Sequence, residues 1–169
     1  MTTSRIDPPF AADETTMLNA WLDFHRETLA VKTEGLSTEQ LRQRSAPPSS
    51  LSLLGLVRHM AEVERAWFQG CLQGEEFKQG LYWTDENEDG DFDDVDTADA
   101  EADFATWRAQ IDLARRAAAG LPLETVGKRL RHGNEVTLRW ILVHMIEEYA
   151  RHNGHADLLR ERIDGVTGE

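Results

Sequence analysis

One stretch near the end of the chain, residues 141–163, has the spacing of a long amphipathic helix with polar groups on its apolar side. Taking Glu148 as the reference, Ile141 and Leu159 fall roughly 20° away around the helix axis and His152 falls roughly 40° away. A carboxylate and an imidazole therefore lie inside the apolar stripe. Burying a polar group without a partner costs on the order of 2–7 kcal/mol. The pattern predicts a partner for both groups, and a metal ion is the simplest one.

The spacing of apolar residues predicts three more long helices, over about 13–32, 52–69 and 97–119, after an extended arm over 1–12. Their buried faces are expected to carry Met17, Leu18, Trp21, Leu22, His25 and Leu29 in the first, Leu56, His59, Met60, Val63 and Trp67 in the second, and Phe104, Trp107, Ile111, Ala114 and Ala118 in the third. Four amphipathic helices without strand-like alternation predict an all-α fold, a single antiparallel four-helix bundle over residues 1–169.

Side chains outside these stripes are expected to face solvent. On the second helix these are Arg58, Glu62 and Glu64. A lone histidine on an apolar face is usually a core residue with a hydrogen-bond partner, which is the interpretation for His25. His132, in the connector before the last helix, is expected to be solvated.

Charge and cysteine content exclude several classes of function. The net charge of −13 argues against nucleic acids and anionic membrane surfaces as partners, because both require a basic surface. The single cysteine, Cys71, rules out an intramolecular disulfide and is expected to have a packing role. No apolar run approaches the length of a membrane span, and residues 1–10 lack the apolar core of a signal peptide. We therefore expect a soluble, cytoplasmic protein.

The segment over 80–95 is strongly acidic and is predicted to be a long irregular loop. Part of it matches a calcium-loop pattern, with oxygen side chains at Asp85, Asn87, Asp89, Asp91, Asp93 and Asp96. The twelfth position is aspartate instead of the usual glutamate, and the residues before the loop do not predict a helix. A solvated acidic crossover is therefore the favoured interpretation, with calcium binding as the alternative.

Histidines and a carboxylate on two predicted helices form a candidate metal site. His59 on the second helix and Glu148 and His152 on the fourth are one set of two imidazoles and a carboxylate, which suits a first-row divalent ion with open positions. His144 lies one turn before Glu148, roughly 40° to the other side, so we place it at the rim or behind the ligands. The alternative is that ordinary hydrogen bonds or an arginine satisfy these groups.

Two segments carry a family resemblance, residues 56–68 and residues 147–155, which read LVRHMAEVERAWF and EEYARHNGH. They resemble the DinB-like metal-binding bundle superfamily, and above all its mainly actinobacterial branch. The resemblance implies a four-helix bundle with a long crossover connection. It also implies a divalent ion held by one ligand from the second helix and two from the last, at His59, Glu148 and His152.

Many members use three histidines, and Glu148 stands here where the first histidine of the last pair would be. The mycothiol-dependent maleylpyruvate isomerases are similar in using a His, Glu, His set. Characterised relatives are isomerases or transferases that use mycothiol, bacillithiol or glutathione. The resemblance thus implies a metal-dependent enzyme, with zinc or nickel as the ion and a low-molecular-weight thiol as the second cofactor. The ion would activate the thiol, because a metal-bound thiol is deprotonated and is therefore a nucleophile at neutral pH.

The remaining expectations concern the surroundings of the ion. The candidates to line or orient a pocket are His144, Trp67, Tyr149 and His155, and those to steer an anionic substrate are Arg58 and Arg151. A homodimer through helix faces is expected. The rival hypothesis is a non-catalytic ligand-binding or stress-related bundle in which a metal only stabilises the fold. A fourth protein ligand that closes the site would favour this rival.

Overall fold

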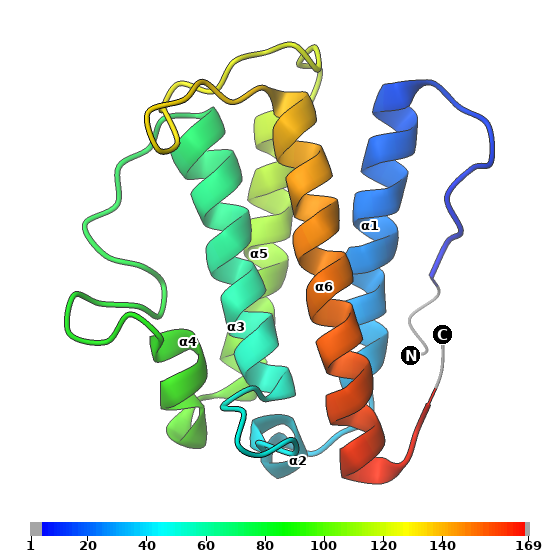
Figure 1. Cartoon of the computed structure of the whole chain (residues 1–169), viewed down its shortest axis with the longest axis vertical. Coiled ribbons are helices and arrows are strands. Elements are labelled where there is room, and N and C mark those ends of the chain that lie inside the picture. Colours follow the sequence, from blue (N-terminus) through cyan, green and yellow to red (C-terminus); the bar gives the residue numbers. More distant parts are fainter. Residues whose placement is uncertain (1–4, 168–169) are drawn as a thin grey trace.

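The computed structural model describes residues 5–167, and the regular structure of these residues is helical, with two isolated bridges and no strand. The elements are α1 (Glu14–Thr33), α2 (Thr38–Arg42), α3 (Leu53–Glu64), the π-helical η1 (Arg65–Leu72), α4 (Gly90–Asp93), the 3-10 turn η2 (Asp94–Thr97), α5 (Ala100–Ala118) and α6 (Leu138–Asp164). Four long helices lie side by side, with α1 against α6 and α3 against α5 (Figure 1). The predicted all-α class is confirmed.

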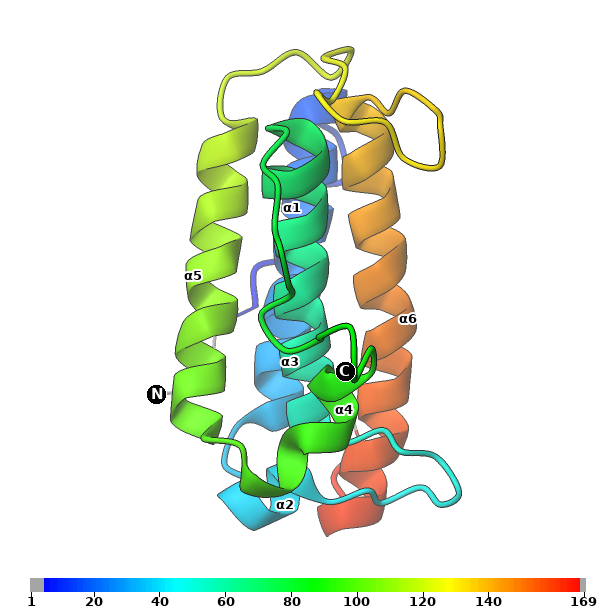
Figure 2. The same cartoon turned by 90° about the vertical axis from the view of Figure 1, so that its left-hand side faces the viewer.

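The helices do not follow a simple up-and-down order. The colours in Figures 1 and 2 show α1 and α6 running in one direction and α3 and α5 in the other. Because α3 and α5 run the same way, residues 73–99 must return along the whole bundle. This return segment is a long crossover, and it passes over the outer side of α3 (Figure 2).

Side-chain caps define where the helices begin. The Asp13 carboxylate accepts a hydrogen bond from the backbone N–H of Thr16 at 3.0 Å, and Thr137 caps α6 in the same way. The third long helix starts later than predicted: Asp99 caps α5, because residues 94–97 form a separate 3-10 turn. At the other end of α6, Gly165 takes a left-handed conformation with φ 77° and ends the helix.

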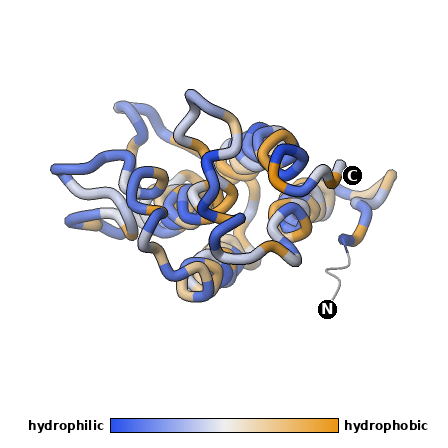
Figure 3. Tube along the Cα trace, turned by 90° about the horizontal axis from the view of Figure 1, so that it is seen from below, coloured by the Kyte–Doolittle hydropathy of each residue, from blue (hydrophilic) through white to orange (hydrophobic). Residues whose placement is uncertain are grey.

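The core is mainly apolar and contains a buried ionic network. Hydrophobic and hydrophilic residues occur in each long helix (Figure 3), and the interior is dominated by leucine, methionine and aromatic side chains. Within it Arg26 donates to both carboxylate oxygens of Glu64, at 2.8 and 2.7 Å. The hydroxyl of Tyr149 donates to Glu64 at 2.8 Å, and the indole of Trp107 donates to that hydroxyl at 2.9 Å. The prediction that Glu64 faces solvent is wrong, because this side chain is fully buried.

The acidic crossover is only partly irregular, which corrects the prediction of a continuous loop over 80–95. Its second half winds into α4 and η2. Arg58 holds α4 in place by donating to the backbone oxygens of Gly90 and Asp91 and to the Asp103 carboxylate. Arg58 is buried, so its predicted place outside the stripe is wrong for a specific reason: the crossover covers it.

Within residues 5–167 none of the helices combines the length and the apolar character that a membrane span needs.

Candidate metal centre

The three predicted ligands meet on the surface between α3 and α6. His59, Glu148 and His152 each offer one ligand atom, and these atoms lie within 4.8 Å of one another. The two imidazole rings are 4.7 Å apart between centroids, and His152 Nε2 lies 3.5 Å from a Glu148 oxygen. Their side chains are 26%, 22% and 13% exposed for His59, Glu148 and His152, so the set is half-buried and open on one side.

This geometry fits a small divalent ion. Two ligand atoms bound to one zinc ion at 2.0–2.1 Å lie no more than about 4.2 Å apart. The observed upper limit of 4.8 Å is therefore within reach of small side-chain movements. Donors of imidazole nitrogen and carboxylate oxygen are those that zinc, nickel and similar ions accept.

Each histidine of the set has a partner on its other ring nitrogen. His59 Nδ1 lies 2.8 Å from the buried Asp91 carboxylate, which leaves Nε2 for an ion. His152 Nδ1 lies 3.4 Å from His155 Nδ1. Such outer partners fix the orientation of metal-binding imidazoles. The contact of Asp91 was missed by sequence reasoning, because it depends on a helical turn 32 residues away in sequence.

The carboxylate of the set is surrounded by imidazoles. The hydrogen bond with His152 lowers the pKa of the Glu148 carboxyl, although partial burial opposes this effect. His144 Nε2 lies 3.2 Å from the other Glu148 oxygen. The His144 ring stacks on Trp140, with centroids 4.9 Å apart, and meets the edge of Trp67 at 4.6 Å. Glu148 is thus held in its ionised form, which is the form that binds cations.

A cleft of ≈ 430 Å³ opens beside two of the three residues, His59 and Glu148. Its lining includes His59, Glu62, Trp67, Trp83, Arg131, Trp140, His144 and Glu148. The cleft gives a small molecule access to the point where the ligand atoms converge. Trp67 and His144 line it as expected, whereas Trp83 and Arg131 come from the crossover and the connector and were not predicted.

Three of the other predicted pocket residues lie elsewhere. Tyr149 is fully buried and contacts Glu64 on the opposite side of α6 from the cleft-lining residues. Arg58 is occupied by the crossover backbone. Arg151 is exposed and pairs with Glu147. These two arginines therefore do not line the cleft, and Tyr149 acts in the core.

Several of the possible calcium residues have other partners in this structure. Asp91 turns inward to His59, Asp96 pairs with Arg44 at 2.7 Å, and Asn87 donates to Asp94 at 3.2 Å. Across residues 5–167 the clusters of ligating side chains include neither Asp85 nor the other acids of this segment. The solvated crossover and the calcium alternative both stay predictions.

His25, expected to be a core histidine, lies half-buried on α1, and burial lowers its pKa. The amide of Asn153 donates to its backbone oxygen at 3.0 Å.

Comparison with known proteins places this geometry in a family. The family model of the mycothiol-S-transferases, a group with the DinB-like fold, matches residues 17–165. The match covers almost all of the four long helices and all residues of the candidate centre. A search of the curated proteins found no match.

Proposed function

We propose that this chain, which belongs to the mycothiol-S-transferase family, joins mycothiol to a small electrophilic substrate at a divalent-metal centre held by His59, Glu148 and His152. The observation that carries the proposal is the convergence of these three side chains, within 4.8 Å, beside an open cleft that His59 and Glu148 line.

The side chains of the site have distinct roles in this proposal. His59 and His152 supply imidazole nitrogens, and the ionised Glu148 supplies a carboxylate oxygen. A divalent ion bound there, with zinc or nickel as the best candidates, lowers the pKa of a coordinated thiol and so supplies a thiolate nucleophile at neutral pH. Asp91 orients His59, and His155 orients His152.

The cleft residues act on the substrates. Trp67 and Trp140 give the cleft apolar walls that exclude water from the reacting atoms, and His144 is held between them. In the transfer step, the thiol gives its proton to solvent and its sulfur forms a bond to an electrophilic carbon. One existing bond of that carbon breaks at the same time, and its electron pair stays on the displaced atom, which takes up a proton from solvent. The open side of the site leaves room for both partners, and this favours an enzyme over a closed structural site.

The test combines metal content with thiol transfer. Purified protein should bind one equivalent of zinc or nickel by titration with elemental analysis. It should also consume mycothiol in the presence of an uncharged electrophile, measured as loss of free thiol. His59→Ala and His152→Ala should lose both properties, while His25→Ala, a histidine on α1 outside the set, should retain them. Full metal content in His59→Ala would defeat the ligand assignment.

A non-catalytic, metal-stabilised bundle is the second candidate, and one contact favours it: His144 Nε2 lies only 3.2 Å from Glu148. Were His144 a fourth ligand, the site would be closed. Under our proposal His144→Ala keeps its zinc affinity within about threefold. A loss as large as that of His59→Ala would point to the structural role instead. The homodimer and the cytoplasmic location stay predictions.

A further inference from the structure

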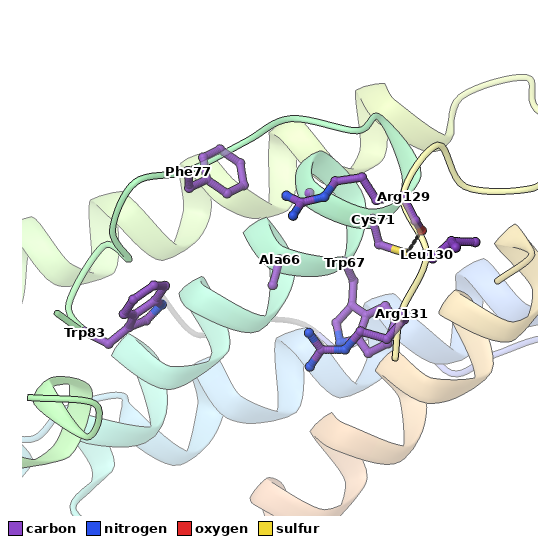
Figure 4. A pocket seen from close by; sticks show the side chains of 9 residues that line it. Ala66, Trp67, Cys71, Phe77, Trp83, Arg129, Leu130 and Arg131 are labelled. Carbon is purple, nitrogen blue, oxygen red and sulfur yellow. Dashed lines mark hydrogen bonds between the residues drawn. The ribbon is translucent and has the colours of Figure 1, made fainter. Parts of the chain in front are cut away.

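A second hollow of ≈ 300 Å³ adjoins the cleft of the candidate metal centre. It lies between η1 and the connector that precedes α6 (Figure 4). The two hollows share Ala66, Trp67, Trp83 and Arg131 in their linings. We call this second hollow the arginine groove, because Arg129 and Arg131 line it. A ligand in the groove can therefore extend into the cleft.

The groove carries uncompensated positive charge. Figure 4 shows the Arg129 and Arg131 side chains extending from the connector over η1. Arg129 donates to the backbone oxygen of Glu75 at 3.0 Å, and the Arg131 guanidinium lies 5.2 Å from the Trp67 ring centroid. Within residues 5–167 neither arginine has a carboxylate within ion-pair distance, although Arg26, Arg44, Arg58, Arg115, Arg139, Arg151 and Arg160 do.

One acidic side chain of the adjoining cleft is already engaged. Glu62 lines the cleft, but its Oε1 accepts the backbone N–H of Tyr82 at 2.6 Å and that of Trp83 at 3.5 Å. These contacts hold one oxygen of Glu62 on the crossover. The two guanidinium groups therefore remain available for an anion from outside.

The rest of the groove is aromatic. Phe77, Trp67 and Trp83 line it, and a third arginine, Arg65, lies over the Phe77 ring at 3.8 Å. Flat aromatic walls favour a planar apolar body, and the forked guanidinium matches a carboxylate.

Cys71 forms part of the wall but does not react. Its thiol donates to the Arg129 backbone oxygen at 3.4 Å, and burial raises its pKa despite the opposing effect of Arg131 and Arg129. A neutral, hydrogen-bonded thiol is a poor nucleophile. The expected packing role of Cys71 fits this position, and the groove is thus a binding surface rather than a second reaction centre.

We propose that the arginine groove binds the carboxylate of a planar organic acid, and that the electrophile which accepts the thiol is a molecule of this class. The second half of this statement rests on the proposed function. The carboxylate lies on Arg129 and Arg131, the planar body lies along Trp67 and Trp83, and the electrophilic carbon reaches the cleft beside His59.

The binding test uses benzoate and its uncharged isostere benzamide with the full chain, followed by tryptophan fluorescence and calorimetry. Benzoate should bind at least about tenfold more tightly than benzamide, because hydrogen bonds to a charged group are the stronger ones. Arg131→Gln and Arg129→Gln should each weaken benzoate binding by about tenfold and leave benzamide unchanged. Arg108→Gln is the matched control: that arginine also lies near an aromatic ring, Phe104 at 5.7 Å, but in a hollow that contains Glu27 and Asp112.

Equal binding of benzoate and benzamide, or an equal effect of Arg108→Gln, overturns the groove as an anion site. The kinetic test uses two thiol acceptors that differ only in a carboxylate and its methyl ester. Arg131→Gln should raise KM for the acid by about tenfold and leave KM for the ester and for mycothiol unchanged. If the acid and the ester behave alike while thiol transfer continues, the substrate class is wrong and the proposed function stands. If benzoate binds but no thiol is transferred, the groove stands and the proposed function fails.

Discussion

Two carboxylates on facing helices of this bundle have opposite surroundings. Glu64 on α3 is fully buried, and its oxygens are taken by Arg26 and Tyr149. Glu148 on α6 is partly exposed, and its closest contacts are two imidazoles beside a cleft. A polar group whose hydrogen bonds are completed by its own chain supports the fold. A group whose neighbours are further metal ligands, with space beside them, is suited to bind something from outside.

The largest loss of stability is expected when the buried network around Glu64 is broken. Glu64→Gln removes the charge that compensates the buried Arg26 guanidinium, so the free energy of unfolding should fall by about 3–5 kcal/mol. Urea denaturation of the metal-free protein measures this. A loss under about 1 kcal/mol would mean that the network does not hold Arg26 as described.

The same substitution at Glu148 should have little effect on stability and a large effect on metal binding. Glu148→Gln is expected to change the free energy of unfolding of the metal-free protein by no more than about 0.5 kcal/mol. Its zinc affinity should fall by more than about 100-fold, since loss of a ligand exceeds the effect of an outer partner. Competition with a chromogenic chelator gives the affinity. If Glu64→Gln and Glu148→Gln changed stability and zinc affinity to the same extent, the proposed difference between a structural and a binding carboxylate would be wrong.

A smaller loss is expected one contact away from the ion. Asp91→Asn keeps the shape of the side chain but weakens the bond to His59 Nδ1, so zinc affinity should fall by about 10- to 100-fold. Asp93→Asn, an exposed neighbour on the same helical turn, serves as the control and should bind zinc like the unchanged protein. If both variants retain full affinity, Asp91 does not orient His59.

The smallest effect belongs to a helix end far from either site. The side-chain hydrogen bond from Thr16 lowers the pKa of Asp13, so the folded state prefers the ionised cap. The cap therefore contributes stability above the unfolded pKa of about 3.9, and this contribution is lost as pH falls through the lower folded value. Asp13→Asn should keep the cap and remove its dependence on pH, as seen in melting temperatures between pH 5 and pH 2. An unchanged pH dependence in this variant would contradict the assignment.

Helical periodicity was sufficient to predict the long helices and to bring His59, Glu148 and His152 onto facing sides. It was less reliable for neighbours of those residues. Tyr149 follows Glu148 directly, but one residue rotates about 100° around a helix, so the side chain enters the core instead of the cleft. Proximity in sequence to Glu148 therefore led to the wrong prediction that Tyr149 lines the pocket.

Two further errors have a common cause in the crossover. Burial of Arg58 and the role of Asp91 both depend on α4 docking against α3, which is a contact between segments more than 30 residues apart. Local patterns carry no information about such docking. The acids of the crossover suggested calcium for the same reason, because composition alone does not say which way each carboxylate points. The arginine groove likewise needs η1 and the connector to be placed together.

The anchoring of α4 by Arg58 has a consequence for how the molecule opens. The crossover rests on a few side chains, whereas the long helices share a continuous core, so partial unfolding should begin there. Release of that segment would take Asp91 from His59 and Trp83 from the cleft in one motion. Amide hydrogen exchange should then reveal a subglobal opening of residues 81–97 in which the bundle stays folded. Under the proposed function, such an opening would loosen the hold of the site on a bound ion and give a route for metal exchange.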